Sequence, residues 1–343
     1  SYRWAAYRYG VCNTGNCFVS GYKFEIQENT RLVEIIETGF IVGLVAGTIK
    51  FSVPLLLASL GEVFSQRSGM INLGLEGIML VGAFFSFLAA VATDNIFIGF
   101  VVGMISGAVM AILLPLISET LGANQIVTGL GIWILGSGLT FFLMRVVFEG
   151  KFVVPVEGLP DIDLPSFISD APVVGQIFFH YDILVYVSFA LVPLFYYILF
   201  RTRWGLNIRS VGENPRVAET LGINPTKIRY YTVILGGALA GTGGAYLALD
   251  YARRFTENIT AGVGFVAVAI VILGRWNPVG ALLGALLFAG TVSLQLRLQS
   301  IGFEIAPQFF FMLPYVLTIF ALVFSSRKSS GPEALGEPYL RER

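Results

Sequence analysis

The sequence predicts an all-α integral membrane protein, a polytopic helical bundle of about nine transmembrane helices (roughly 8 to 10). Three observations support this fold class. Of the 343 residues, 55% are hydrophobic and only 13% are charged, about half the charged fraction of a soluble domain. Mean hydropathy is +0.76. Long apolar runs recur, and each approaches the roughly 20 residues that a helix needs to cross a bilayer core of about 30 Å.

The apolar runs define the expected domain organisation. Charge-free runs cover residues 96–117, 126–144, 183–200, 231–249, 276–296 and 305–326, with shorter ones at 77–93 and 258–274. The first run, residues 39–60, contains Lys50 and Pro54. We therefore expect a transmembrane domain over residues 39–326, between an N-terminal polar tail, residues 1–38, and a C-terminal tail, residues 327–343.

The distribution of charge predicts the orientation. Six basic residues crowd the loop 201–229, and others at positions 275, 327 and 328 fall on the same side when the spans are counted in order. Basic residues in short loops mark the cytoplasmic side, so we expect this loop and the C-terminal tail in the cytoplasm. The connection 148–182 carries six acidic residues and one lysine. It is expected outside, as is the tail 1–38, because the number of spans is odd.

The centre of the loop 201–229 predicts a short helix. It reads G-E-N-P-R-V-A-E-T-L-G, in which Asn214 is a good N-cap, Pro215 suits the first helical position and Gly222 can end the helix in the left-handed conformation. A helix of about two turns in a polar loop has no lipid to bury against. We therefore expect a docking element for a soluble partner on the inner face.

Polar residues at membrane depth are the candidates for a solute path. Glu62, Asn72 and Glu76 lie in L-G-E-V-F-S-Q-R-S-G-M-I-N-L-G-L-E-G, and carboxylates at such depth usually face a cavity or a partner. Either this stretch is an interrupted helix whose side chains line the path, or it is an ordinary cytoplasmic turn. Gln125 and Thr128 are one helical turn apart, although Thr128 has the alternative of bonding back to its own helix.

A glycine face is expected in the run 231–249. Gly237, Gly241 and Gly244 recur at three- and four-residue spacing, which lets helix backbones approach closely. The face serves either tight packing alone or sliding during transport.

Three arginines break the orientation rule. Arg253, Arg254 and Arg297 fall in loops assigned to the outside. Either the topology differs there, or these cations meet an acidic partner outside the membrane.

Several function classes find little support in the sequence. One histidine and two cysteines leave little material for a metal site, so we expect no metal, no cofactor and no catalytic residues. Cys12 and Cys17 either pair outside the cell or are free thiols. Zero net charge gives no sign of nucleic-acid binding. The alternative from a different functional class is an ion-coupled secondary transporter. It would need several charged groups deep in the spans, and Lys50 is almost the only charged residue there.

Three motifs carry a resemblance to a known family. They are L-G-E-V-F-S-Q-R-S-G-M-I-N-L-G-L-E-G-I-M-L-V-G-A-F, then G-L-N-I-R-S-V-G-E-N-P-R-V-A-E-T-L-G-I-N, then I-L-G-R-W-N-P-V-G-A-L-L-G-A. In this order, over about residues 45 to 325, they resemble the permease subunits of ABC importers in the ribose and branched-chain amino acid permease superfamily. The chain looks closest to the nucleoside type that works with basic membrane lipoproteins. Gln66 departs from the pattern, since similar sequences tend to have an acidic residue there.

The resemblance implies a function, partners and a coupling site. It implies a multi-pass cell-membrane permease that moves nucleosides, or alternatively a simple sugar of the ribose or galactose type. Sugar permeases typically carry an I-D-L-S-type sequence where this chain has Ile71, Asn72, Leu73 and Gly74, which favours nucleosides. The implied partners are an ATP-binding subunit, a second permease subunit, an external substrate-binding lipoprotein and the bilayer. The second permease subunit is either a copy of this chain or a different one. The implied ATPase-coupling helix comprises Glu213, Asn214, Pro215, Arg216, Val217, Glu219, Leu221 and Gly222.

Overall fold

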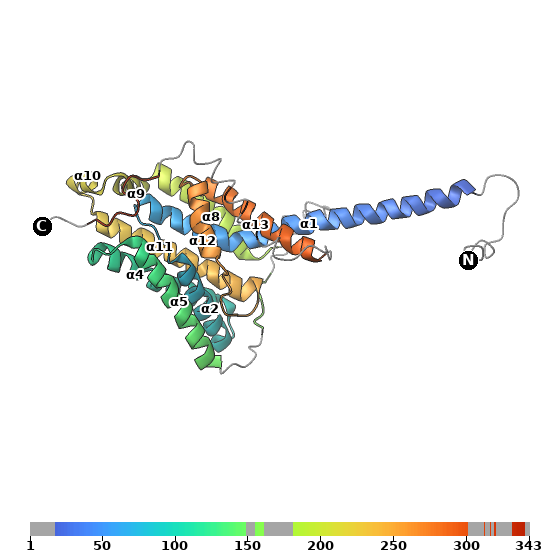
Figure 1. The fold of residues 1–343 in the computed structure, drawn as a ribbon, viewed down its shortest axis with the longest axis horizontal. Coiled ribbons are helices and arrows are strands. Elements are labelled where there is room, and N and C mark those ends of the chain that lie inside the picture. The colour runs from blue at the N-terminus through green and yellow to red at the C-terminus, as the bar shows by residue number, and fades with distance from the viewer. Residues whose placement is uncertain are drawn as a thin grey trace. The chain divides into compact units, whose positions relative to one another are not determined.

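The computed structural model describes residues 18–148, 155–160, 181–300 and 331–339, together with the isolated positions 312, 316 and 319. The chain divides into two units, Ser1–Gly43 and Leu44–Arg343. Within the described ranges the elements are helices joined by loops and turns (Figure 1). The all-helical fold class is therefore confirmed for the part of the chain that the structure describes.

The structure describes thirteen helical elements. In chain order they are α1 (Phe18–Arg67), α2 (Leu75–Thr93), α3 (Ile96–Ala111), α4 (Leu113–Pro115), the π-helix η2 (Leu116–Thr120), α5 (Gln125–Phe148), α8 (Ile183–Arg201), α9 (Arg203–Glu213), α10 (Pro215–Thr220), α11 (Pro225–Tyr246), the π-helix η3 (Leu247–Tyr251), α12 (Val263–Leu273) and α13 (Pro278–Ser300). The polar tail expected at residues 1–38 is helical from Phe18 onward.

Seven helical stretches among the described residues are long and apolar enough to cross a membrane. They are Gly39–Arg67, Leu75–Thr93, Ile96–Thr120, Gln125–Phe148, Ile183–Arg201, Pro225–Tyr251 and Pro278–Gln299. The span predicted at residues 258–274 is shorter than expected: its helix α12 has 11 residues, about 16 Å long, because turns with positive φ at Asn258, Ala261 and Gly262 precede it. The predicted span 305–326 lies outside the described residues apart from three positions, so the count of nine is not confirmed.

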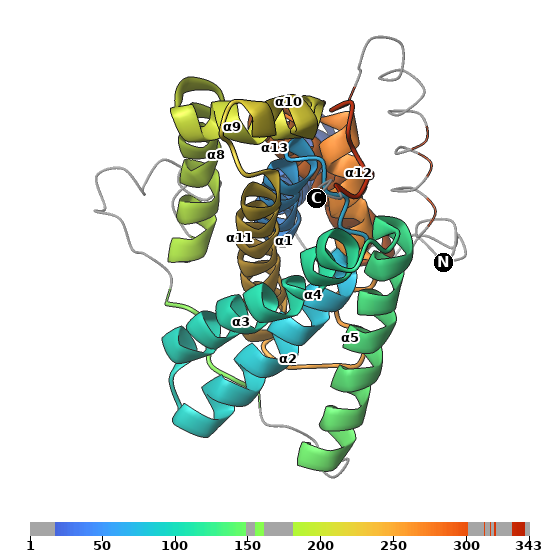
Figure 2. The ribbon, with the colours of Figure 1, turned by 90° about the vertical axis from the view of Figure 1, so that its left-hand side faces the viewer.

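Glycines bring the central helices into backbone contact. α11 packs against both α2 and α3, and Figure 2 shows the three helices side by side. A Cβ atom on Gly82 of α2 would lie 2.5 Å from Gly241 Cα, and one on Gly107 of α3 would lie 2.6 Å from the same atom. Ordinary carbon contacts are about 3.5 to 4.0 Å, so only glycine permits this approach. The predicted glycine face is a packing interface.

The break between α1 and α2 is buried. Ser68, Met70 and Asn72 have no exposed surface, and Gly69 has φ +92°, a left-handed conformation that glycine adopts without strain. The stretch from residue 68 to residue 74 is therefore a buried connection between α1 and α2.

Candidate functional site

The predicted helix in the polar loop has the expected ends. α10 begins at Pro215, and Oδ1 of Asn214 accepts a hydrogen bond from Val217 N at 3.1 Å. It ends at Thr220 with Leu221 as C-cap. Gly222 follows with φ +83°, and Ile223 N donates to Ala218 O at 3.1 Å. The preceding helix α9, capped by the Thr202 hydroxyl, was not predicted separately.

α10 presents apolar side chains outward. Ala218 is 1% exposed and faces the protein, whereas Val217 is 54% and Leu221 is 73% exposed. Neither residue lies in a candidate membrane span. Val217 and Leu221, four positions apart, form a small exposed apolar surface outside the spans.

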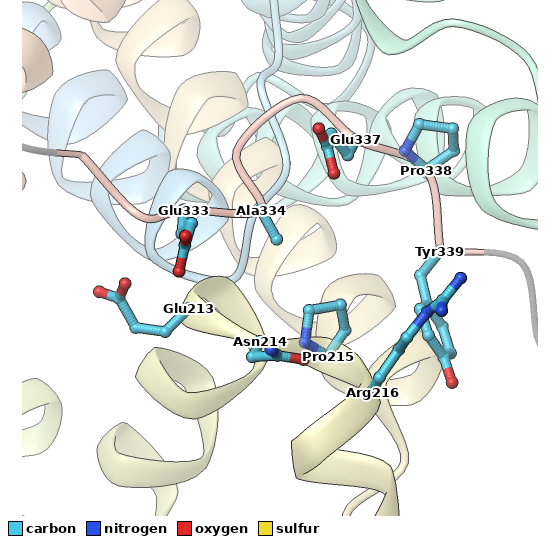
Figure 3. Close-up of a pocket in the computed structure, with 9 residues that line it drawn as sticks. All are labelled: Glu213, Asn214, Pro215, Arg216, Glu333, Ala334, Glu337, Pro338 and Tyr339. Carbon is cyan, nitrogen blue, oxygen red and sulfur yellow. The ribbon is translucent and has the colours of Figure 1, made fainter.

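The C-terminal segment, residues 331–339, packs against this part of the protein. It is held by main-chain hydrogen bonds from Ala334 N to Gly212 O at 2.9 Å and from Gly336 N to Gly69 O at 3.0 Å. Figure 3 shows the groove of about 420 Å³ that α10 and the C-terminal segment form together. Its lining residues are Glu213, Asn214, Pro215, Arg216, Glu333, Ala334, Glu337, Pro338 and Tyr339.

A buried ion pair lies behind the groove. Arg229 Nη1 and Glu119 Oε1 are 2.7 Å apart, and neither side chain is exposed. Arg229 also donates to Ser68 O at 3.1 Å and to Glu337 O at 2.8 Å, and Glu119 Oε2 accepts from Tyr339 N at 3.3 Å. A buried pair is stable only when further hydrogen bonds satisfy its remaining groups. The C-terminal segment supplies two of these hydrogen bonds.

The three sequence motifs of the resemblance meet at one place in the fold. Arg67, which belongs to the first motif and ends α1, donates from Nε to Trp276 O at 2.8 Å, and Gln66 Oε1 accepts from Trp276 Nε1 at 2.7 Å. A Cβ atom on Gly212, in the second motif, would collide with Arg67 O. Gln66, the departure from the family pattern, thus joins the first motif to the third.

Glu62 and Asn72 lie together inside the bundle. Glu62 Oε1 accepts from Gln66 Nε2 at 2.9 Å and from Asn72 N at 3.0 Å, and Asn72 Oδ1 accepts from Gly74 N at 3.1 Å. Among the described residues, Glu62 Oε2 and Asn72 Nδ2 have no hydrogen-bond partner. Both side chains are fully buried. Their hydrogen bonds to Asn72 N and Gly74 N fix the α1–α2 break.

Glu76 caps a helix from another part of the chain. Its carboxylate accepts hydrogen bonds from Thr260 Oγ1 at 2.5 Å, Gly262 N at 2.8 Å and Gly264 N at 2.7 Å. These donors surround the N-terminus of α12, where an anion is favoured by the unpaired N–H groups and the helix dipole. Glu76 therefore holds the short helix α12 against α2.

Gln125 contacts the residue before Asn72, whereas Thr128 bonds to its own helix. Gln125 Oε1 accepts from Ile71 N at 3.0 Å, and Thr128 Oγ1 donates to Asn124 O at 2.9 Å, back to its own helix. The five predicted path residues are thus divided among three places, and their role in a solute path stays a prediction.

A mainly apolar cavity of about 380 Å³ lies between α1, η3, α12 and α13. Its lining residues are Phe51, Leu55, Leu247, Tyr251, Ala252, Ile259, Thr260, Ala261, Gly262, Val263, Val266, Phe288, Val292 and Gln295. All are uncharged. The predicted path residues do not line it, although Glu76 bonds Thr260 and Gly262 in its wall.

The three arginines that break the orientation rule lie in two places, after η3 and in the last turn of α13. Arg253 and Arg254 are exposed in the turn after η3, and Arg253 O accepts from Val156 N at 3.0 Å. Arg297 lies half-buried in the last turn of α13.

The sequence alone does not predict the ion pair or the position of the C-terminal segment. Arg229 is one of six basic residues in the loop 201–229, and Glu119 is 110 positions away from it. One signal was present: the apolar run that starts at residue 96 stops just before Glu119, and a carboxylate at a span end calls for a cationic partner.

Comparison with known proteins identifies the family. The family described as the permease component of the branched-chain amino acid transport system matches residues 44–322. The chain belongs to this permease family. The resemblance deduced from the three motifs is thereby confirmed.

Three relatives are similar over most of their length. A nucleoside ABC transporter permease protein of Lactococcus lactis is 37% identical, over 88% of this chain and 97% of that protein. A guanosine ABC transporter permease protein of Bacillus subtilis is 36% identical, over 87% of this chain and 96% of that protein. A Haloferax volcanii protein provisionally named as a glucose ABC transporter permease is 35% identical, over 88% of this chain and 99% of that protein. No solved structure matches the chain. The chain is thus a transport subunit of the ABC class and not an enzyme of its own.

Proposed function

We propose that the permease translocates a nucleoside, delivered by an external binding protein, in an importer driven by a separate ATP-binding subunit. The observation that carries the solute class is the identity of 36 and 37% to permease proteins named for guanosine and for nucleosides. A simple sugar is the second candidate, because a 35% identical relative is named for glucose.

The apolar cavity is the proposed solute site. Phe51, Tyr251 and Phe288 in its lining offer aromatic surfaces on which a base can stack. Gln295 adds an amide that can hydrogen-bond to base or ribose. A mainly apolar pocket with few polar groups is typical of sites for small neutral solutes.

The electrostatics of this site favour a solute without charge. The lining has no cationic side chain, and the Glu76 carboxylate already accepts the N–H groups of Gly262 and Gly264 at the start of α12. A phosphate or a free carboxylate would find neither a cation nor an open helix N-terminus. We therefore expect nucleosides to be accepted, and nucleotides and amino acids to be rejected.

α10 is the proposed coupling helix. Its capped ends and its exposed Val217 and Leu221 suit insertion into a groove of an ATP-binding subunit. The sequence contains no G-x-x-x-x-G-K-[ST] phosphate loop, so hydrolysis is assigned to that separate chain.

The proposed orientation places α10 and the C-terminus in the cytoplasm. Arg67, Arg209 and Arg229 lie at this end, in line with the positive-inside rule. Arg253, Arg254 and Arg297 then face outward, where they would meet the external binding protein.

We also propose a second, non-identical permease chain as partner. Each of the three organisms named above has a further permease protein that matches this chain, at only 23 to 28% identity. Two permeases of different sequence are therefore expected to assemble with one another.

Competition for uptake tests the solute class. The whole importer, reconstituted in proteoliposomes, is given radiolabelled guanosine and an excess of unlabelled inosine, guanosine monophosphate, leucine or glucose. We expect inosine alone to compete. Absence of guanosine uptake together with uptake of radiolabelled glucose would support the sugar alternative, and strong competition by the monophosphate or by leucine would contradict the uncharged-solute argument.

A further inference from the structure

We propose that the C-terminal segment, residues 331–339, is a working part of the coupling apparatus, in which Tyr339 holds α10 and relays its displacement to the buried Arg229–Glu119 pair. The proposal rests on the proposed role of α10. It assigns a positioning function to a segment that the sequence marks only as a tail.

Tyr339 contacts both sides of this connection directly. Its hydroxyl donates a hydrogen bond to Glu219 Oε2 on α10, and its main-chain N–H donates to Glu119 Oε2 at 3.3 Å. Two residues earlier, Glu337 O accepts from Arg229 Nη1 at 2.8 Å. The side chain of one residue therefore binds the helix, while the main chain of the same short stretch binds both members of the ion pair.

The second end of the connection is rigid. Arg229 and Glu119 are fully buried, and moving either charge away from its hydrogen bonds in a dry environment is costly. A displacement of α10 that pulls on Tyr339 therefore shifts the pair as a unit rather than breaking it. Arg229 is in the second turn of α11, and only four residues separate α11 from α10. The chain itself therefore also connects α10 to the ion pair.

From the ion pair the contacts continue to the α1–α2 break. Gln125 Nε2 donates to Glu119 Oε1 at 3.4 Å, and Gln125 Oε1 accepts from Ile71 N at 3.0 Å. Ile71 precedes Asn72, whose N–H is held by Glu62. An unbroken series of polar contacts thus joins α10 to the interrupted segment inside the bundle, and such a series is a physical route for coupling.

A purely structural role for the segment makes a different prediction. If residues 331–339 only cover the polar groups of Arg229 and Glu119, loss of the Tyr339 hydroxyl leaves the main-chain bonds intact and changes nothing but stability. If Tyr339 positions α10, loss of the hydroxyl lowers the solute moved for each ATP hydrolysed. The ratio of solute uptake to ATP hydrolysis therefore distinguishes the structural role from the positioning role.

The experiment uses the complete importer in proteoliposomes. Uptake of guanosine and hydrolysis of ATP are measured in parallel for Tyr339→Phe and for Tyr197→Phe, which removes the hydroxyl of an exposed tyrosine on α8. Tyr339→Phe is expected to lower the ratio on the order of fivefold, with the ATP-binding subunit still bound. Tyr197→Phe is expected to leave the ratio unchanged.

A double-mutant cycle then tests whether Tyr339 acts through Glu219. Tyr339→Phe is expected to have no further effect in a Glu219→Ala background, because the contact is already lost. An unchanged ratio in Tyr339→Phe, or equal effects in the two backgrounds, overturns the proposal. A comparison with the double variant Val217→Asp and Leu221→Asp separates this proposal from the proposed function. If the double variant uncouples transport and Tyr339→Phe does not, the relay through Tyr339 is wrong and α10 keeps its role. If neither the double variant nor Tyr339→Phe uncouples transport, the coupling role of α10 is wrong as well.

Discussion

Replacing Gly82 by alanine tests the backbone contact that holds the central helices together. The new Cβ would lie 2.5 Å from Gly241 Cα and 2.6 Å from Gly241 O, about 1 Å closer than carbon atoms normally approach. Both opposing atoms are main chain, so no side chain can rotate away. Overpacking of this kind costs about 1 to 3 kcal/mol.

Gly138→Ala is the matched control. It adds the same methyl group to a helix, but no atom lies within 4 Å of the added Cβ. Since the intrinsic gain of alanine over glycine in a helix, about 1 kcal/mol, is common to both variants, their difference isolates the clash. Thermal unfolding of the purified protein in lipid nanodiscs should place the midpoint of Gly82→Ala several degrees below that of Gly138→Ala. Equal midpoints would refute the close approach of α2 and α11.

Further predictions concern orientation, docking and hydrolysis. In a cysteine-free background, a cysteine at Ser166 should react with an impermeant thiol reagent added outside cells, and one at Ser210 should not; the opposite result would invert the topology. Charge reversal of Arg253, Arg254 and Arg297 together should slow association of the external binding protein and weaken its salt dependence, whereas unchanged kinetics at low salt would exclude a docking role. The purified chain alone should show no ATPase activity, and robust turnover by a contaminant-free preparation would contradict the permease assignment.

The fold class and the caps of α10 were predictable because their signals are local. Hydropathy reflects the environment of each segment, and the Asn214, Pro215 and Gly222 positions prescribe backbone conformations that need no distant partner. The glycine spacing likewise predicted a close helix contact, although it did not identify Gly82 and Gly107 as the residues on the other side.

The polar network was not predictable in the same way because its partners are far apart in the sequence. Glu76 and Gly264 are separated by 188 positions, and Tyr339 reaches Glu119 across 220. A single sequence shows that Glu76 adjoins a long apolar run, but not whether its carboxylate faces a solute or caps another helix. The short length of α12 follows from turns with positive φ at Asn258 and Ala261. This conformation is uncommon for alanine, although asparagine adopts it more readily than most residues.

Replacing Val217 and Leu221 together by aspartate tests most directly whether α10 couples hydrolysis to transport. Both side chains are more than half exposed, so the change should alter folding by little, typically within about 0.5 kcal/mol per site. Uptake and solute-stimulated ATPase activity are measured in proteoliposomes that contain the whole complex. We expect uptake to be lost or uncoupled from hydrolysis while the permease still inserts and folds. Wild-type uptake and wild-type stimulation in an assembled double mutant would contradict the assignment of α10 as the coupling helix.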